Sequence, residues 1–209
     1  MDNMSKLDKF LSKEVVYESN AFWESMLDYV NNNKDIAIDS IVHSFQEVYD
    51  TNKRQENKKR QPQYVQYTLM RSRALQQKAF YYIELFDENY YFGGELNFKE
   101  IPFYWLYEAY FSFCNKVKEK SQYYVMQIGE IELERICMIE LNTCHKLMKY
   151  LFEAALFELM ETKQYQEMPV ETHFLLGDYR GEAETLFIKN DMTNQIWGLL
   201  NGILQSNAE

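Results

Sequence analysis

The stretch GDYRGEAE, residues 177–184, carries the side chains best suited to chemistry. Four charged residues crowd this short segment, which contains two glycines, and three of them, Asp178, Arg180 and Glu182, are the candidates. Glycine permits backbone conformations that other residues avoid, and loops of this kind often present binding or catalytic groups. The same pattern is equally typical of the charged tip of a hairpin. We therefore treat these three residues as a candidate polar site and as the centre of an alternative in which the chain is an enzyme.

Cysteine and histidine side chains give weaker indications. His145 directly follows Cys144, and Cys137 lies one heptad before Cys144. Adjacent residues on a helix point about 100° apart, and cysteines two turns apart cannot share a tetrahedral ion without ligands from elsewhere. A packed histidine beside two core thiols is the preferred interpretation, and we expect no metal site.

Paired carboxylates occur at Glu130 and Glu134, which share one face of a helix because they are four residues apart. Two close carboxylates can raise a pKa for acid–base work, but acids in a first helical turn also offset the helix dipole. The second interpretation is preferred. The chain has no dinucleotide-binding, Walker, HExxH, GxSxG or paired CxxC motif. We therefore assign no catalytic residue, metal or cofactor, and lean towards a protein that is not an enzyme.

Positive charge is concentrated in residues 53–78. This segment has eight basic residues and one acidic residue, a net charge of +7, which leaves −17 for the rest of a chain whose total is −10. Seven of them are candidates for contact with nucleic acid or an acidic partner: Lys53, Arg54, Lys58, Lys59, Arg60, Arg71 and Arg73. Other interpretations are a solvated loop that neutralises an acidic body and a loop that contacts a neighbouring subunit. Nucleic-acid binding would be weak, because the loop could release at most roughly four or five counterions, and it would be steeply salt-dependent, because it would rest on that release.

Aromatic side chains are dense, with seven in the fourteen positions of residues 101–114. Their spacing after Pro102 predicts a helix with one broad and one narrow apolar face, which should contact neighbours on two sides. If the ring surface exceeds what one core can bury, the remainder is available to a partner, since tyrosine and tryptophan are favoured at interfaces. The candidate partner-binding residues are Tyr81, Tyr90, Tyr91, Tyr104 and Trp105.

Hydrophobic periodicity predicts the elements that must position these residues. A long helical pattern covers about 129–164, and a short amphipathic one covers 195–204. Alternating or aromatic segments within 64–92, and apolar segments within 172–189, are typical of strands, although 64–77 is also compatible with a helix. The expected fold class is α+β: a predominantly helical single domain, residues 1–209, with a small antiparallel sheet.

Composition narrows the class of protein. The stretch 51–62 has no apolar side chain before its closing proline and is predicted to be an exposed basic loop. Three cysteines cannot all pair within the chain, so reduced thiols are expected. We find no signal peptide and no apolar run of the 18 to 20 or so residues that a spanning helix needs. These observations favour a cytoplasmic protein that does not enter a membrane.

The function that these patterns favour is binding to another protein, as an adaptor, an immunity-type inhibitor or a subunit of an assembly, including a homo-oligomer. Two alternatives stay open. The first is a nucleic-acid-binding accessory protein that uses residues 53–78, and the second is an enzyme with its site at the 177–184 turn.

Overall fold

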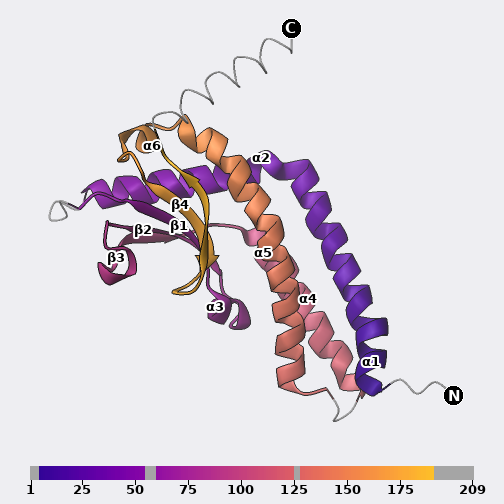
Figure 1. Ribbon diagram of the computed structural model, residues 1–209. Coiled ribbons are helices and arrows are strands. Elements are labelled where there is room, and N and C mark those ends of the chain that lie inside the picture. Colours follow the sequence, from indigo (N-terminus) through magenta and orange to yellow (C-terminus); the bar gives the residue numbers. More distant parts are fainter. Residues whose placement is uncertain (1–4, 55–59, 125–127, 191–209) are drawn as a thin grey trace, which may run out of the picture. The chain divides into compact units, whose positions relative to one another are not determined.

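The computed structural model describes residues 5–54, 60–124 and 128–190 (Figure 1). Its contacts divide the chain into two compact units, neither of which is continuous in sequence. The helical unit comprises Met1–Ser40, Arg71–Phe80 and Pro102–Phe152. The sheet unit comprises Ile41–Met70, Tyr81–Ile101 and Glu153–Glu209. The predicted single domain stays a prediction, and each unit is described by itself.

The helical unit begins with a capped helix. Its elements are α1 (Lys6–Phe10), the π-helical turn η1 (Leu11–Val15), α2 (Val16–Arg54) as far as Ser40, α3 (Arg71–Leu75), α4 (Tyr104–Ser121), η3 (Gln122–Tyr124) and α5 (Glu130–Met160) as far as Phe152. The Ser5 hydroxyl accepts a hydrogen bond from the Asp8 N–H at 3.0 Å, and the Asp8 carboxylate accepts one from the Ser5 N–H. This capping box satisfies backbone donors that the first turn leaves unpaired.

Helices α2 and α4 pack in antiparallel directions. The ring of Phe22 meets that of Phe113 at 5.6 Å between centroids. Tyr29, further along α2, stacks on Trp105, nearer the start of α4, at 4.5 Å. Residue numbers therefore rise along one helix as they fall along the other. The predicted aromatic helix after Pro102 is confirmed as α4.

Helix α5 also packs on α4 in the antiparallel sense. The Tyr110 hydroxyl donates a hydrogen bond to the Cys137 carbonyl at 3.1 Å, and the ring of Phe103 meets that of Phe152 at 6.0 Å. The three long helical segments of this unit thus run side by side (Figure 1). The predicted long helix over about 129–164 is confirmed as α5.

A kink interrupts α2 at Asn33, whose φ of −136° and ψ of 26° are not helical. The sequence there reads Asn31-Asn32-Asn33, and asparagine side chains compete with the helix for backbone hydrogen bonds. Asn33 does so here, because its Nδ2 donates to the Tyr29 carbonyl at 3.2 Å. The three asparagines therefore bend the helix without ending it.

The sheet unit contains five strands in the order β3-β2-β1-β4-β5. They are β1 (Tyr64–Leu69), β2 (Tyr81–Phe86), β3 (Glu95–Glu100), β4 (His173–Asp178) and β5 (Ala183–Ile188). The end of α2, the end of α5, the 3₁₀ turn η2 (Tyr90–Phe92) and α6 (Lys163–Glu167) complete the unit. The α+β, predominantly helical class is confirmed (Figure 1).

One strand pairing differs from the predicted antiparallel sheet. Strands β1 and β4 pair in parallel, with Tyr64 opposite His173 and Leu69 opposite Asp178, while the other pairs are antiparallel. Parallel neighbours need a crossover connection of a dozen residues or more. The chain between β1 and β4 supplies one, since it contains both α4 and α5. The sheet is therefore mixed.

The two faces of the sheet differ in character. One face of β1 and β2 is apolar and fully buried, with side chains including Val65, Tyr67 and Ile83. The other face carries Gln66 and Thr68, which are buried as well. The alternating sequence of β1 is typical of a strand with one face in solvent, but both faces of β1 are buried.

Two predicted boundaries need correction. The first group of strands was expected to end near residue 92, but a further strand, β3, follows Gly93 and Gly94. The basic segment 51–62 is not wholly a loop, because α2 extends to Arg54. Residues 55–59 and the predicted helix over 195–204 lie outside the described residues.

Candidate functional site

A buried acid lies on the polar face of the sheet unit. Glu84 of β2 is only 2% exposed, and its carboxylate accepts a hydrogen bond from the Thr68 hydroxyl of β1. Burial raises the pKa of Glu84 above its ordinary value, and the Thr68 hydrogen bond and the Arg180 charge oppose that rise. A carboxyl group in such surroundings holds its proton more tightly than one in water.

Two tyrosines from η2 extend this polar cluster. The Tyr90 hydroxyl donates to the Gln66 side-chain oxygen, and the Gln66 amide donates to the Tyr91 hydroxyl at 2.9 Å. Tyr90 has a φ of 51°, a left-handed conformation that costs free energy for a residue with a side chain. Burial is the largest of the effects that raise the pKa of Tyr90, so its hydroxyl keeps its proton. The two tyrosines are thus held in one arrangement.

The turn before β3 is held by an ion pair between a buried acid and an exposed arginine. Asp87 has no exposed surface, and its carboxylate accepts from Arg60 at 2.6 Å and from the Asn89 N–H at 2.9 Å. Arg60 also donates to the Gly93 carbonyl at 3.1 Å. A Cβ atom on Gly93 would lie 2.3 Å from an oxygen of the Asp87 carboxylate, so a side chain there would displace that carboxylate. Gly94 has a φ of +73°, which also favours glycine. These contacts position η2 over the sheet.

Aromatic rings gather around η2. Tyr90 contacts Tyr64 at 4.8 Å, Phe86 at 5.1 Å and Tyr91 at 4.1 Å between centroids. Phe92, the last residue of η2, has a completely exposed side chain, and Phe98 on the edge strand β3 is 53% exposed. We refer to Tyr90, Tyr91, Phe92 and Phe98 as the aromatic patch. It combines tyrosines that are held in place with phenylalanines that face solvent.

The predicted partner-binding aromatic residues do not all lie at the surface. Tyr90 and Tyr91 belong to the aromatic patch. Tyr81 is fully buried, because it lies on the face of β2 opposite to Glu84, and its ring is not available to a partner. Tyr104 and Trp105 belong to the helical unit, where the first is exposed and the second stacks on Tyr29. A role for these residues in binding stays a prediction.

The 177–184 turn connects β4 and β5 as a tight hairpin. The Asp178 N–H donates to the Glu182 carbonyl at 3.1 Å, and a Cβ on Gly177 would lie 2.3 Å from that carbonyl oxygen. The left-handed residue is Arg180, with a φ of 51°, rather than either glycine. Arg180 lies close enough to Glu84 for its charge to lower the pKa of that carboxyl group. The hairpin thus places one of its three candidate residues near the buried acid, and its role as an enzyme site stays a prediction.

Several predicted basic contacts are engaged within the chain. Lys53 pairs with Glu167 at 2.7 Å and Arg60 with Asp87 at 2.6 Å. Arg71 and Arg73 lie on α3 rather than on a strand, and the Arg73 Nε donates to the Ala79 carbonyl at 2.8 Å. Arg54 is exposed at the end of α2, and Lys58 and Lys59 lie outside the described residues. These contacts favour the interpretation that Lys53 and Arg60 neutralise acidic side chains of the same chain.

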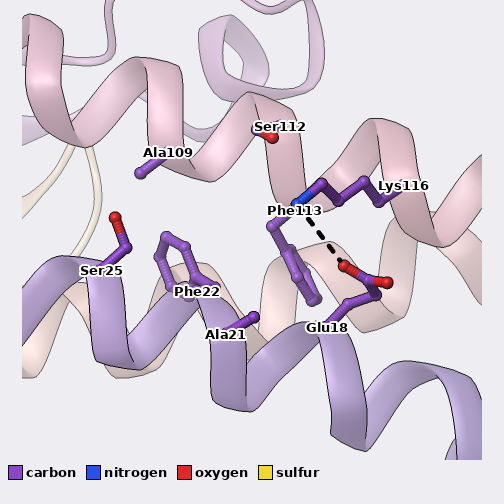
Figure 2. Close-up of a pocket in the computed structure, with 8 residues that line it drawn as sticks. All are labelled: Glu18, Ala21, Phe22, Ser25, Ala109, Ser112, Phe113 and Lys116. Carbon is purple, nitrogen blue, oxygen red and sulfur yellow. Dashed lines mark ion pairs between the residues drawn. The ribbon is translucent and has the colours of Figure 1, made fainter.

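The helical unit has a small groove between α2 and α4. Figure 2 shows Glu18 of α2 and Lys116 of α4 pointing toward each other at one end, where their charged atoms are 3.7 Å apart. Small side chains line the walls, including Ala21 and Ala109. The groove has a volume of about 90 Å³, below the roughly 300 Å³ of typical ligand pockets. It is best explained as a close helix contact with an ion pair at its rim.

Sequence reasoning overlooked Glu84, Gln66 and Thr68. Glu84 interrupts the apolar run Phe80–Phe86, and an acid in the middle of such a run is a signal of a buried charge. The signal is missed when the alternation is assumed to place polar residues in solvent. Gln66 was overlooked for a related reason. Its partners, Tyr90 and Tyr91, come from η2, and the local sequence does not show that η2 lies over β1.

Comparison of the chain with protein-family models, with curated proteins and with solved structures gives no match. Within residues 5–54, 60–124 and 128–190, no helix has the length and apolar character to cross a membrane. The same part of the chain holds no group of three or more histidine, cysteine or acidic side chains arranged to bind a metal ion.

Proposed function

We propose that this chain is a non-enzymatic, cytoplasmic protein that acts by binding another protein through the aromatic patch of its sheet unit. The observation that carries the proposal is the exposure of two rings: Phe92, which follows two tyrosines that are held in place, and Phe98, which lies on the same sheet face as the Gln66 that holds them. Single exposed apolar residues are common, but neighbouring exposed rings are typical of interaction surfaces. An adaptor, an inhibitor or an assembly subunit would each use such a surface.

The tyrosines of the patch are arranged before any partner arrives. Gln66 binds both hydroxyl groups, and the ion pair of Arg60 with Asp87 fixes the turn that carries them. Ordering a side chain on binding costs about 0.5 to 1.5 kcal/mol, so groups that are already ordered lose less free energy. Pre-arranged rings therefore favour binding by rigid contact.

The chemistry around the patch indicates the kind of partner. Glu88 and Glu95 are exposed beside it, while Lys99 on β3 is already paired with Glu47 at 2.9 Å. The Phe98 N–H is bonded to the Asn97 side-chain oxygen at 3.0 Å, so it is not available to an added strand. The partner segment that fits is one whose apolar side chains meet the rings and whose lysine or arginine side chains meet the acids.

A peptide library displayed on phage tests this proposal. Selection on the immobilised wild-type protein is expected to enrich peptides with apolar residues flanked by lysine or arginine. Binding of the enriched peptides should be lost on the variant with Phe92→Ser and Phe98→Ser, because exposed rings contribute most when a partner buries them.

A second variant controls for surface substitution in general. Phe157→Ser removes from α5 a ring whose exposure, 47%, is close to the 53% of Phe98. It should bind the enriched peptides as the wild-type protein does. The proposal is wrong if selection enriches no common sequence, or if the double variant retains the same peptides with the same affinity.

A further inference from the structure

A second cavity lies in the helical unit, between α3, α4 and α5. Its volume is about 130 Å³. It is lined by Cys114 and Lys118 of α4, by Cys137, Glu130 and Glu134 of α5, and by Gln77 just after α3, among others. Gln77 adopts a φ of 53° and donates to the Asn115 side chain at 2.7 Å. Two thiols and several polar groups therefore meet at one opening.

Two thiols from neighbouring helices line the same cavity. Cys114 of α4 and Cys137 of α5 are both free cysteines that line this cavity, and the interaction with the other thiol is the largest influence on the pKa of each. Cys114 is partly exposed, while Cys137 is 8% exposed. The Tyr110 hydroxyl donates to the Cys137 carbonyl at 3.1 Å, which holds α4 against α5 at this level. The pair is therefore close, held in place and reachable from the cavity.

This interaction shifts the pKa values of the two thiols in opposite directions. It lowers the pKa of Cys137, an effect larger than the opposing effect of burial, and it raises the pKa of Cys114. The negative charges of the nearby Glu134 and Glu140 carboxylates oppose this effect, because they raise the pKa of Cys137. Cys137 therefore has more thiolate character than Cys114. Reactive cysteines are those with thiolate character and access to solvent.

We propose that Cys114 and Cys137 form a thiol modification site that a peroxide converts to a disulfide between α4 and α5. The Cys137 thiolate attacks the O–O bond of hydrogen peroxide, which gives a sulfenic acid and hydroxide, and the hydroxide takes up a proton. The Cys114 sulfur then attacks the sulfenic sulfur. The S–S bond forms, the S–O bond breaks, and water leaves. In sum, two thiols and one peroxide give one disulfide and two waters, with two electrons passing to the peroxide.

Cys144 provides an internal comparison. It lies two turns after Cys137 on α5, is fully buried, and does not line the cavity. Burial raises its pKa, so it stays a thiol that peroxide reaches poorly. The site is thus specific to two of the three cysteines.

The test is treatment of the folded wild-type protein with hydrogen peroxide, followed by alkylation and peptide mapping under non-reducing conditions. The expected result is a mass loss of two hydrogen atoms, a cross-linked peptide pair containing Cys114 and Cys137, and an alkylated Cys144. A reducing agent should restore the original masses.

Variants sharpen the assignment. Cys144→Ser should form the same cross-link at the same rate, and Cys114→Ser should form no disulfide but leave Cys137 as a sulfenic acid that dimedone labels. The proposal is overturned if the wild-type protein gives only sulfinic or sulfonic acids without a cross-link, or if Cys144 is oxidised as fast as the pair. This result does not depend on the aromatic patch, so it succeeds or fails separately from the proposed function.

Discussion

Glu84 is the residue at which burial and charge conflict most clearly. Its carboxyl group is buried on the sheet face, with a hydrogen bond from Thr68 and the charge of Arg180 nearby. Burial is the larger effect, so the pKa of Glu84 is raised. The folded protein then binds this proton more tightly than the unfolded chain does, and the free energy of unfolding falls as the pH rises above about 4.5.

The first prediction follows from the raised pKa of Glu84 and the loss of stability that it causes at higher pH. Glu84→Gln removes the ionisation but keeps an oxygen that accepts from Thr68. At pH 4 the variant and the wild-type protein should have similar free energies of unfolding, because the acid is largely protonated in both states. At pH 7 the variant should be more stable by about 1 to 3 kcal/mol, the usual cost of burying a polar group with incomplete partners. Urea unfolding at both pH values measures the difference.

A variant that is equally destabilised at both pH values would show that Glu84 acts only by packing. Glu88→Gln is the matched control, since this exposed acid lies four residues further along and should show no such pH-dependent gain.

At the scale of elements, α6 depends on a lysine that follows β5. The Lys189 ammonium is buried and donates to the carbonyls of Tyr165, Gln166 and Met168 at 2.7, 3.0 and 2.6 Å. These carbonyls lie at the end of a short helix, which leaves its last acceptors unpaired. One charged side chain thus joins the helix to the edge of the sheet.

Lys189→Met tests this connection. The variant should lose about 1 to 3 kcal/mol of stability, because it removes the lysine donor from the buried Met168 carbonyl and from the partly buried Gln166 carbonyl. Lys163→Met is the control, since Lys163 is 81% exposed and its ion pair with Glu167 is 3.7 Å long. It should change stability by less than about 0.5 kcal/mol. Similar losses in both variants, measured by urea unfolding, would contradict the role assigned to Lys189.

Long elements were predictable from sequence, and short ones were less so. The patterns of α4 and α5 repeat over several turns, and the strands around the 177–184 hairpin are bounded by clear turn residues. Strand β3 was missed because ELNFKE has only two apolar side chains, and an edge strand needs few. The parallel pairing of β1 with β4 was missed because no local signal records which distant strands meet.

The site was predictable only in part, for the same reason. Tyr90, Tyr91 and Arg180 were found from their residue types. Glu84 and Gln66 were not, since their importance comes from partners that the fold brings to them. Local sequence thus indicated the side chains at the surface of the site and not the buried residues that hold them.

At the scale of the whole molecule, charge is distributed unevenly. The chain carries −10 in total, and Lys53 and Arg60 within its basic segment are each paired with an acid. A nucleic-acid backbone would have to compete with those acids for the same side chains, so binding to RNA or DNA stays a prediction with less charge to support it. A basic segment of another protein, in contrast, complements the acidic remainder.

The affinity of the natural partner tests the central claim most directly. A protein that co-purifies in stoichiometric amount from the native source would be isolated and titrated calorimetrically against three forms of this chain. The account predicts that Phe92→Ser with Phe98→Ser weakens binding at least about tenfold, equivalent to about 1.4 kcal/mol, whereas Phe157→Ser binds as the wild type does. An unchanged affinity for the double variant would contradict it.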